Sequence, residues 1–155
     1  MCWMCDRPGT TFADYAEQWL LPTIDRHGWA VTAVDGDRVH APFAYTIGLT
    51  EQGLPELVIT GLPQAGAHAV LQSVAQHCLE EERLVPGTQP TVDGVEIGLE
   101  VVAVPHPEAH LFDAVSLYGT ETRALQLVWQ DARGRWPWDV GFRGFQPVYG
   151  PRNRG

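Results

Sequence analysis

The chain has 155 residues, of which 45% are hydrophobic and 19% are charged, and its formal net charge is -9. This length and composition predict one globular domain rather than a disordered or fibrous chain. All ten basic residues are arginine, and an acidic chain without a basic stripe excludes ordinary phosphate-backbone binding, so we expect no nucleic-acid partner.

The apolar runs of the sequence are far shorter than the roughly 20 residues that a membrane span requires. The first six residues, Met-Cys-Trp-Met-Cys-Asp, lack the basic and apolar regions of a signal peptide. Three cysteines are an odd number, and without an export signal they favour reduced thiols. We therefore expect a cytoplasmic protein without a membrane partner.

The first predicted element is a helix that runs from Thr11 to His27. Thr11 and Asp14 have the spacing of an acidic capping box, and apolar residues then recur at helical spacing. Pro22 predicts a kink or a restart, because proline has no amide hydrogen to donate to the preceding turn. Gly28 is typical of the residue that follows the end of a helix.

A strand hairpin is predicted after this helix. Residues 29–34 form its first strand, residues 35–37 form the turn, and the return begins at residues 38–40 and resumes over residues 43–49. Within residues 43–49 the large apolar side chains share one face of the strand, and Ala, Thr and Gly share the other. A face of small residues either lies beneath a helix or leaves room for another group to approach the backbone.

The remaining predicted elements are a strand over residues 56–62, a helix over 64–83, a strand over 95–104, a helix over 107–117 and a strand over 123–130, which a turn follows. These elements predict a single α+β domain over residues 1–155, with a mainly antiparallel sheet and two or three packing helices. A split barrel is the alternative form of the sheet. Residues 1–9 form an N-terminal segment with a C-x-x-C pair, and residues 140–155 are predicted to be a Gly- and Pro-rich coil.

Five blocks of the sequence stand out: Met-Cys-x-x-Cys-Asp at the start, His27–Trp29, Phe43–Leu49, Pro55–Val58, and Gln126–Asp131 with the Gly-Arg-Trp-Pro-Trp that ends at Trp138. Together they resemble a bacterial family known as domain of unknown function 4262, over nearly the whole chain. The resemblance implies no activity, cofactor or catalytic residue, so it assigns no site to this sequence.

A second analogy is with split-barrel flavin proteins such as the flavin reductases. Their strand–strand–helix segment is similar to Phe43–Leu49, Glu56–Leu62 and Gln64–Arg83. No cluster of lysine or arginine that could bind the cofactor's phosphate accompanies the pattern here. The analogy implies a flavin cofactor as an alternative function.

Two pairs of residues have the chemistry of metal ligands, Cys2 with Cys5 and His106 with His110. The cysteines have the spacing of a zinc or redox pair, but a structural zinc site takes four ligands and no second C-x-x-C occurs. The histidines stand four apart in an H-x-E-x-H sequence, which is not a metallohydrolase motif. A zinc site built from all four residues is one interpretation. Exposed or capping histidines without a metal are the other.

The motifs of nucleophilic and phosphate chemistry are absent from the sequence. The two serines, Ser73 and Ser116, lie in predicted helices without a G-x-S-x-G elbow, and there is no glycine-rich phosphate loop. Asp131 and Asp139 are a pair of carboxylates, but acidic residues beside a turn are usually solvated turn formers. The sequence thus names no reaction.

The remaining candidates are aromatic and polar residues that could form a stacking pocket for a planar or anionic ligand. They are Tyr45, Thr46, Trp129, Arg135, Trp136, Trp138 and Arg143. The apolar run that ends at Trp129 is expected to be a core strand, and Trp136, Pro137 and Trp138 are expected to form a rigid aromatic platform after it.

Three hypotheses of function follow. The first is a small-molecule-binding or accessory domain without its own catalytic machinery, with homodimerisation left open. The second is an oxidoreductase that holds a flavin between the Thr46 face and the Trp136–Trp138 platform. The third is a metal-binding protein that uses the cysteine and histidine pairs.

Overall fold

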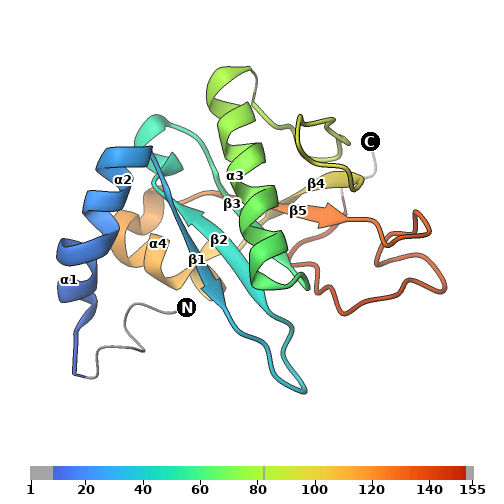
Figure 1. The fold of residues 1–155 in the computed structure, drawn as a ribbon, viewed down its shortest axis with the longest axis horizontal. Coiled ribbons are helices and arrows are strands. Elements are labelled where there is room, and N and C mark those ends of the chain that lie inside the picture. Colours follow the sequence, from blue (N-terminus) through green and yellow to red (C-terminus); the bar gives the residue numbers. More distant parts are fainter. Residues whose placement is uncertain (1–8, 82, 153–155) are drawn as a thin grey trace.

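Five strands form one sheet in the order β1-β2-β3-β5-β4 (Figure 1). The structure is a computed structural model that describes residues 9–81 and 83–152. The strands are β1 (Ala30–Val34), β2 (Phe43–Ile47), β3 (Glu56–Thr60), β4 (Leu99–Val104) and β5 (Ala124–Trp129). All neighbouring strands are antiparallel except β3 and β5, which are parallel. The expected single α+β domain with a mainly antiparallel sheet is confirmed. The described strands leave the sheet open, so they do not close into a split barrel.

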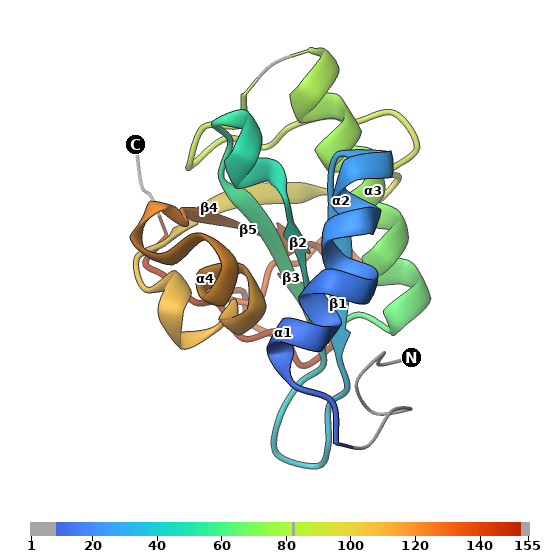
Figure 2. The same ribbon diagram turned by 90° about the vertical axis from the view of Figure 1, so that its left-hand side faces the viewer.

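Helices cover both faces of the sheet, and α3 and α4 lie on opposite sides of it (Figure 2). One apolar core lies beneath α3 (Gln64–Glu80), and the other lies beneath α1 (Phe12–Tyr15), α2 (Leu21–His27) and α4 (Phe112–Tyr118). The two inner strands β3 and β5 are buried at every position, because helices cover both faces of the sheet there. None of the helices in the described residues is long and apolar enough to cross a bilayer.

The N-terminal helical segment begins and ends as its sequence predicts. The Thr11 hydroxyl accepts the Asp14 N–H at 3.2 Å, and the Asp14 carboxylate accepts the Thr11 N–H at 3.1 Å. A π-helical turn at Ala16–Leu20 lies directly before α2, whose first turn contains Pro22. The missing N–H of Pro22 interrupts the hydrogen-bond ladder there, so the helix restarts. Gly28 ends α2 in the left-handed conformation, with φ of 90°.

The predicted return of the hairpin at residues 38–40 is wrong. Val34 pairs directly with Phe43, so residues 35–42 form a loop. The Asp37 carboxylate accepts the N–H groups of Val39 and His40, both at 2.8 Å. An aspartate that captures nearby backbone N–H groups competes with the strand ladder, and this turn stops the pairing.

Most other elements differ from their predicted bounds by one to three residues, and two differ more. The strand over residues 95–104 begins only at Leu99, because a turn at Gly94 (φ 87°) precedes it, and residues 95–98 follow that turn as irregular chain. The helix over residues 107–117 is divided into a 3-10 turn at Pro107–Ala109 and α4. The carbonyl of Pro107 accepts the N–H groups of both His110 and Leu111, at 3.0 and 2.8 Å, which closes a separate turn before α4 begins.

Candidate functional site

Tyr45 and Thr46 are neighbours in β2, so their side chains point to opposite faces of the sheet. Both are buried, with 2% and 0% of their surface exposed. The Tyr45 hydroxyl accepts the N–H of Asp113, a residue of the first turn of α4, at 3.1 Å. The Thr46 hydroxyl donates to Glu56 at 2.8 Å and accepts the Leu57 N–H at 2.9 Å. These two predicted ligand residues therefore belong to the packed interior.

Glu56 is a fully buried carboxylate that sequence reasoning did not single out. It accepts five hydrogen bonds: from the hydroxyls of Thr46 and Thr50 (2.8 and 2.6 Å) and from the N–H groups of Gly48, Leu49 and Thr50 (3.1, 3.2 and 2.9 Å). Burial raises the pKa of Glu56, and these donors oppose that rise. Because every partner donates, the carboxylate fixes the loop after β2. A lone acid in an otherwise apolar strand was its signal in the sequence.

The tryptophans after β5 form the expected platform. The Trp136 and Trp138 rings stack with centroids 5.7 Å apart and planes inclined by 16°. Trp129 is core, since it is 8% exposed and its indole N–H donates to the Thr60 carbonyl at 2.8 Å. The Arg135 guanidinium donates to the carbonyl of Gly141 at 2.9 Å. The structure thus brings Trp136 and Trp138 together, whereas Trp129 and Arg135 have other partners.

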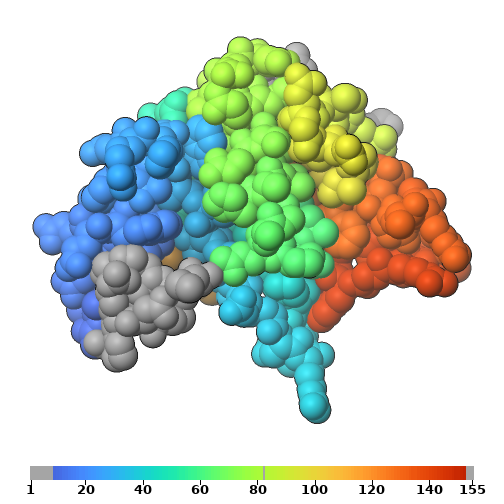
Figure 3. Space-filling model, in the orientation of Figure 1, coloured from blue at the N-terminus to red at the C-terminus, as the bar shows by residue number. Residues whose placement is uncertain are grey.

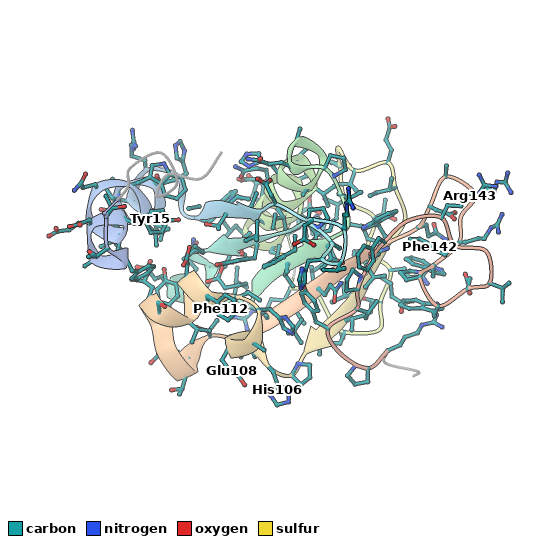
Figure 4. All side chains as sticks on the ribbon, turned by 90° about the horizontal axis from the view of Figure 1, so that it is seen from below. Tyr15, His106, Glu108, Phe112, Phe142 and Arg143 are labelled. Carbon is teal, nitrogen blue, oxygen red and sulfur yellow. The ribbon has the colours of Figure 1, made fainter. Side chains whose placement is uncertain are left out.

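Asp131 organises the loop that carries this platform. Its carboxylate accepts the N–H groups of Arg133, Arg135 and Arg143, each at 2.9 Å. The pKa of Asp131 is lowered, first by the Arg135 N–H and then by those of Arg143 and Arg133. Asp139 accepts the Trp136 N–H at 2.9 Å. The two carboxylates are turn formers, and Arg143 lies on the outer loop at the far end from α4 (Figure 4).

The two predicted metal-ligand histidines have different partners. His106 is exposed and its Nδ1 lies 3.1 Å from Oε1 of Glu108 (Figure 4). The His110 ring stacks on Tyr149, with centroids 3.7 Å apart and planes inclined by 4°. Burial lowers the pKa of His110, and the neighbouring Glu108 opposes this shift. The two rings therefore contact different neighbours, His106 a carboxylate and His110 an aromatic ring.

The cysteines divide between α3 and the N-terminal segment. Cys2 and Cys5 lie outside the described residues, so a zinc site that joins them to His106 and His110 stays a prediction. Cys78 lies on α3, where burial raises the pKa of its thiol. Across residues 9–81 and 83–152, no group of three or more His, Cys, Asp or Glu side chains could hold a metal ion.

Two open hollows, of about 390 Å³ and about 450 Å³, lie along α3, the helix in the middle of the face shown in Figure 3. They share the lining residues Trp29, Gln72 and Gln76 and therefore adjoin. We call the two together the α3 groove. Its other lining residues are Trp19, Thr23, His27, Ala30, Val31 and His68 in the larger hollow, and Ser73, His77, Glu80, Glu81, Val92 and Asp93 in the smaller one.

A chain of hydrogen bonds fixes the shared part of the α3 groove. The indole N–H of Trp29 donates to Oε1 of Gln72 at 2.7 Å, and Nε2 of Gln72 lies 3.2 Å from Nε2 of His68. An indole N–H can only donate, so the Gln72 amide is oriented with its NH₂ toward His68. His68 must then accept through Nε2, which places its own proton on Nδ1. The side chains of Gln72 and His68 are thus held in defined positions.

The two hollows of the α3 groove differ in chemistry. His27 and His68 line the larger hollow, and Glu80, Glu81 and Asp93 line the smaller one, where Nδ1 of His77 lies 3.4 Å from Oε2 of Glu81. Sequence reasoning predicted the helix but did not single out this surface. The available signal was the polar series His68, Gln72, Gln76 and Glu80, in which each residue follows the last by four positions and therefore lies on the same side of the helix.

No curated protein and no solved structure matches the chain. A family model described as "Domain of unknown function (DUF4262)" matches residues 23–143. The matched region contains all five strands and α3, and it confirms the resemblance seen in the sequence blocks. The chain therefore belongs to the family Domain of unknown function 4262.

Proposed function

We propose that this protein is a small-molecule-binding domain, and that its ligand is a small organic molecule with a planar body and a cationic amine. The observation that carries the proposal is the α3 groove, which is lined by the partly exposed Trp19, the largely buried Trp29, hydrogen-bonded amides and acidic groups. Ligand sites commonly combine apolar or aromatic walls with a few fixed polar groups. The groove has this composition, and its hydrogen-bond network is already formed without a ligand.

The charges of the groove support an amine at one end of the ligand. Glu80, Glu81 and Asp93 line the smaller hollow, and the whole chain carries a net charge of -9. Such a field favours the approach of a cation. The carboxamides of Gln72 and Gln76 line both hollows, where they can serve as both donors and acceptors for the body of the ligand.

The test is a thermal-shift titration with tyramine, compared with 4-hydroxyphenylacetate, which has the same ring but a carboxylate in place of the amine. A ligand present at 100 times its Kd stabilises the fold by about 2.7 kcal/mol. We expect the amine to raise the melting temperature and the carboxylate to leave it unchanged. Equal shifts with both compounds, or none with either, would contradict the proposal. Flavins, nucleotides and divalent metals belong in the same panel as tests of the other hypotheses.

The location of the site is tested by two glutamine variants on the same helix. Gln72→Ala removes the amide that joins Trp29 to His68, whereas Gln64→Ala removes an exposed amide that does not line the groove. Each variant's shift with tyramine is measured against its own melting temperature without ligand. We expect the shift to be lost in the first variant and kept in the second. Equal shifts in both would place the ligand elsewhere.

A further inference from the structure

Glu100 is a second buried carboxylate, and it lies on the edge strand β4. Only 2% of its surface is exposed. Its Oε2 accepts Nε of Arg152 at 3.0 Å, and its Oε1 accepts Nη2 of Arg152 at 3.3 Å. The same Oε1 also accepts the side-chain amide of Gln89 at 3.1 Å. The carboxylate of Glu100 therefore accepts hydrogen bonds from two nitrogens of one guanidinium. The planar guanidinium of arginine suits this arrangement better than the ammonium group of lysine does.

The guanidinium of Arg152 also lies over an aromatic ring. Its central carbon is 4.3 Å from the centroid of Trp138, and Trp136 stacks on that same indole. A cation over a tryptophan face is favourable, the more so where solvent is partly excluded. The Arg152 side chain keeps 35% of its surface exposed. One planar cation is thus bound by a carboxylate and a ring face, and part of it remains accessible to solvent.

The groups that bind this cation are held in place by contacts that do not involve Arg152. Glu100 is fixed by the pairing of β4 with β5, in which it lies opposite Val128. The segment that carries Gln89 is joined to β4 by the bond from the Val101 N–H to the Thr88 carbonyl at 2.9 Å. The turn that carries Trp136 and Trp138 is closed by the Asp139 N–H, which donates to the Trp136 carbonyl at 2.9 Å. The site is therefore formed by the body of the domain.

We propose that Glu100, Gln89 and Trp138 form a receptor for guanidinium groups, which Arg152 occupies from within the chain and which another guanidinium compound takes when Arg152 is displaced. A buried carboxylate that loses its cation is strongly destabilised, so an emptied receptor favours a replacement cation. The ligand class is a guanidinium, either on the arginine side chain of a peptide or on a small free compound. This receptor shares no residue with the α3 groove, so it stands independently of the function proposed there.

The first test compares the wild-type protein with Arg152→Ala. Both are titrated with N-acetylarginine amide and with methylguanidinium, and binding is followed at the indole N–H signals in NMR spectra. If Arg152 fills the receptor for about nine-tenths of the time, its removal strengthens the apparent affinity about tenfold. Binding of both probes indicates that the guanidinium alone is recognised, and binding of only the first indicates a peptide source. Either result supports the receptor, whereas no gain in affinity for either probe would overturn it.

Three control measurements define the receptor. N-acetyllysine amide should bind Arg152→Ala more weakly than its arginine counterpart, because an ammonium cannot donate two parallel bonds or stack as a plane. Adding either Glu100→Gln or Trp138→Leu to Arg152→Ala should weaken binding of the arginine probe. Two separate double variants are used, so that the test still stands if one of them fails to fold. Arg143→Ala removes an arginine outside the site and should bind like the wild type. Binding that persists in both double variants would overturn the proposal.

Discussion

Glu56 is the residue on which the loop between β2 and β3 depends. Its carboxylate is 0% exposed and accepts five hydrogen bonds, two of them from hydroxyl groups and three from backbone N–H groups. Glutamine at this position has the same shape, but its NH₂ group would face N–H donors. Buried donors that lose their acceptor are costly, so we expect Glu56→Gln to lower the free energy of unfolding by about 2–4 kcal/mol.

Urea denaturation at neutral pH measures this loss, with Glu17→Gln as the control. Glu17 is exposed on the N-terminal helical segment, and replacing it should change stability by less than about 0.5 kcal/mol. The same small effect at Glu56 would mean that the loop is not held by the charge. The comparison separates a structural carboxylate from an ordinary surface acid.

Two glycines predict opposite effects of the same substitution. Gly48 has φ of 128°, and a Cβ there would lie 2.9 Å from both the Gly28 carbonyl and Cα of Trp29. Gly66 lies within α3, and a Cβ there would meet nothing within 4 Å. We expect Gly66→Ala to stabilise the protein by about 0.5–1 kcal/mol, because alanine loses less backbone entropy in a helix. Gly48→Ala should destabilise it by at least about 1–3 kcal/mol from backbone strain alone.

Urea denaturation curves of the two alanine variants measure both the sign and the size of the change in the free energy of unfolding. A stable Gly48→Ala would show that the close approach of residues 28 and 29 can relax.

The sequence allowed two interpretations of the small face of β2, a covering helix or the approach of another group. Both are realised. Ala44 packs in the core beneath α3, and at Gly48 the approaching group is the chain's own backbone.

At the scale of elements, the C-terminal segment completes the sheet where β3 and β5 separate. The carboxamide of Gln146 accepts the Trp129 N–H and donates to the Trp129 carbonyl, both at 2.9 Å. It therefore takes the place of a neighbouring strand at the end of β5. Gln126 supports the same segment, because it donates to the Pro147 carbonyl and accepts the Tyr149 N–H, both at 2.8 Å.

Gln146→Ala should therefore leave both backbone groups of Trp129 without their partner. A buried backbone group that loses its partner costs about 1–3 kcal/mol, and we expect a total loss in that range because water can reach part of the opened site. Gln18→Ala, on the exposed part of the N-terminal helix, is the control. Denaturant unfolding followed by tryptophan fluorescence gives the difference. A loss no larger than that of the control would show that the segment does not replace a strand.

The elements that the sequence predicted well are those in which local chemistry and burial agree. The N-terminal helix has a capping box, an apolar face and a terminal glycine, and its restart follows from one proline. The predicted strand at residues 38–40 is wrong because the Asp37 side chain accepts backbone N–H groups that strand pairing would have used. The predicted start of β4 is wrong because residues 95–98 alternate like a strand in sequence but follow a tight turn at Gly94. In both cases a short-range turn overrode the periodicity of the side chains.

At the scale of the whole molecule, the sequence indicated the fold class but not the surfaces that could carry function. The α3 groove joins Trp29 to side chains four positions apart on α3, and the guanidinium receptor joins β4, the Trp136–Trp138 platform and Arg152. Both depend on which segments lie side by side, and residue types do not determine this without the topology. The predicted ligand residues Tyr45 and Thr46 show the converse. Their types suit a pocket, but their positions in a central strand place them in the core.

The net charge of -9 predicts a response of the whole molecule to salt. Only four ion pairs link charged side chains in the described residues, and three of them involve a histidine. Repulsion among the excess carboxylates therefore outweighs the attraction that salt would screen. Raising the ionic strength from about 0.01 M to about 0.15 M shortens the screening length from about 30 Å to about 8 Å. We expect the melting temperature to rise with it.

The expected gain is under about 1 kcal/mol, which corresponds to at most about 2–4 °C for a chain of this size. Differential scanning calorimetry in sodium chloride measures it. Potassium chloride at equal ionic strength is the control, since screening depends on ionic strength and a specific ion effect does not. A melting temperature that falls with both salts would show that attraction within the folded chain outweighs repulsion. The ion pair between Glu100 and Arg152 would then be the first to examine, because its carboxylate is the most deeply buried of the four.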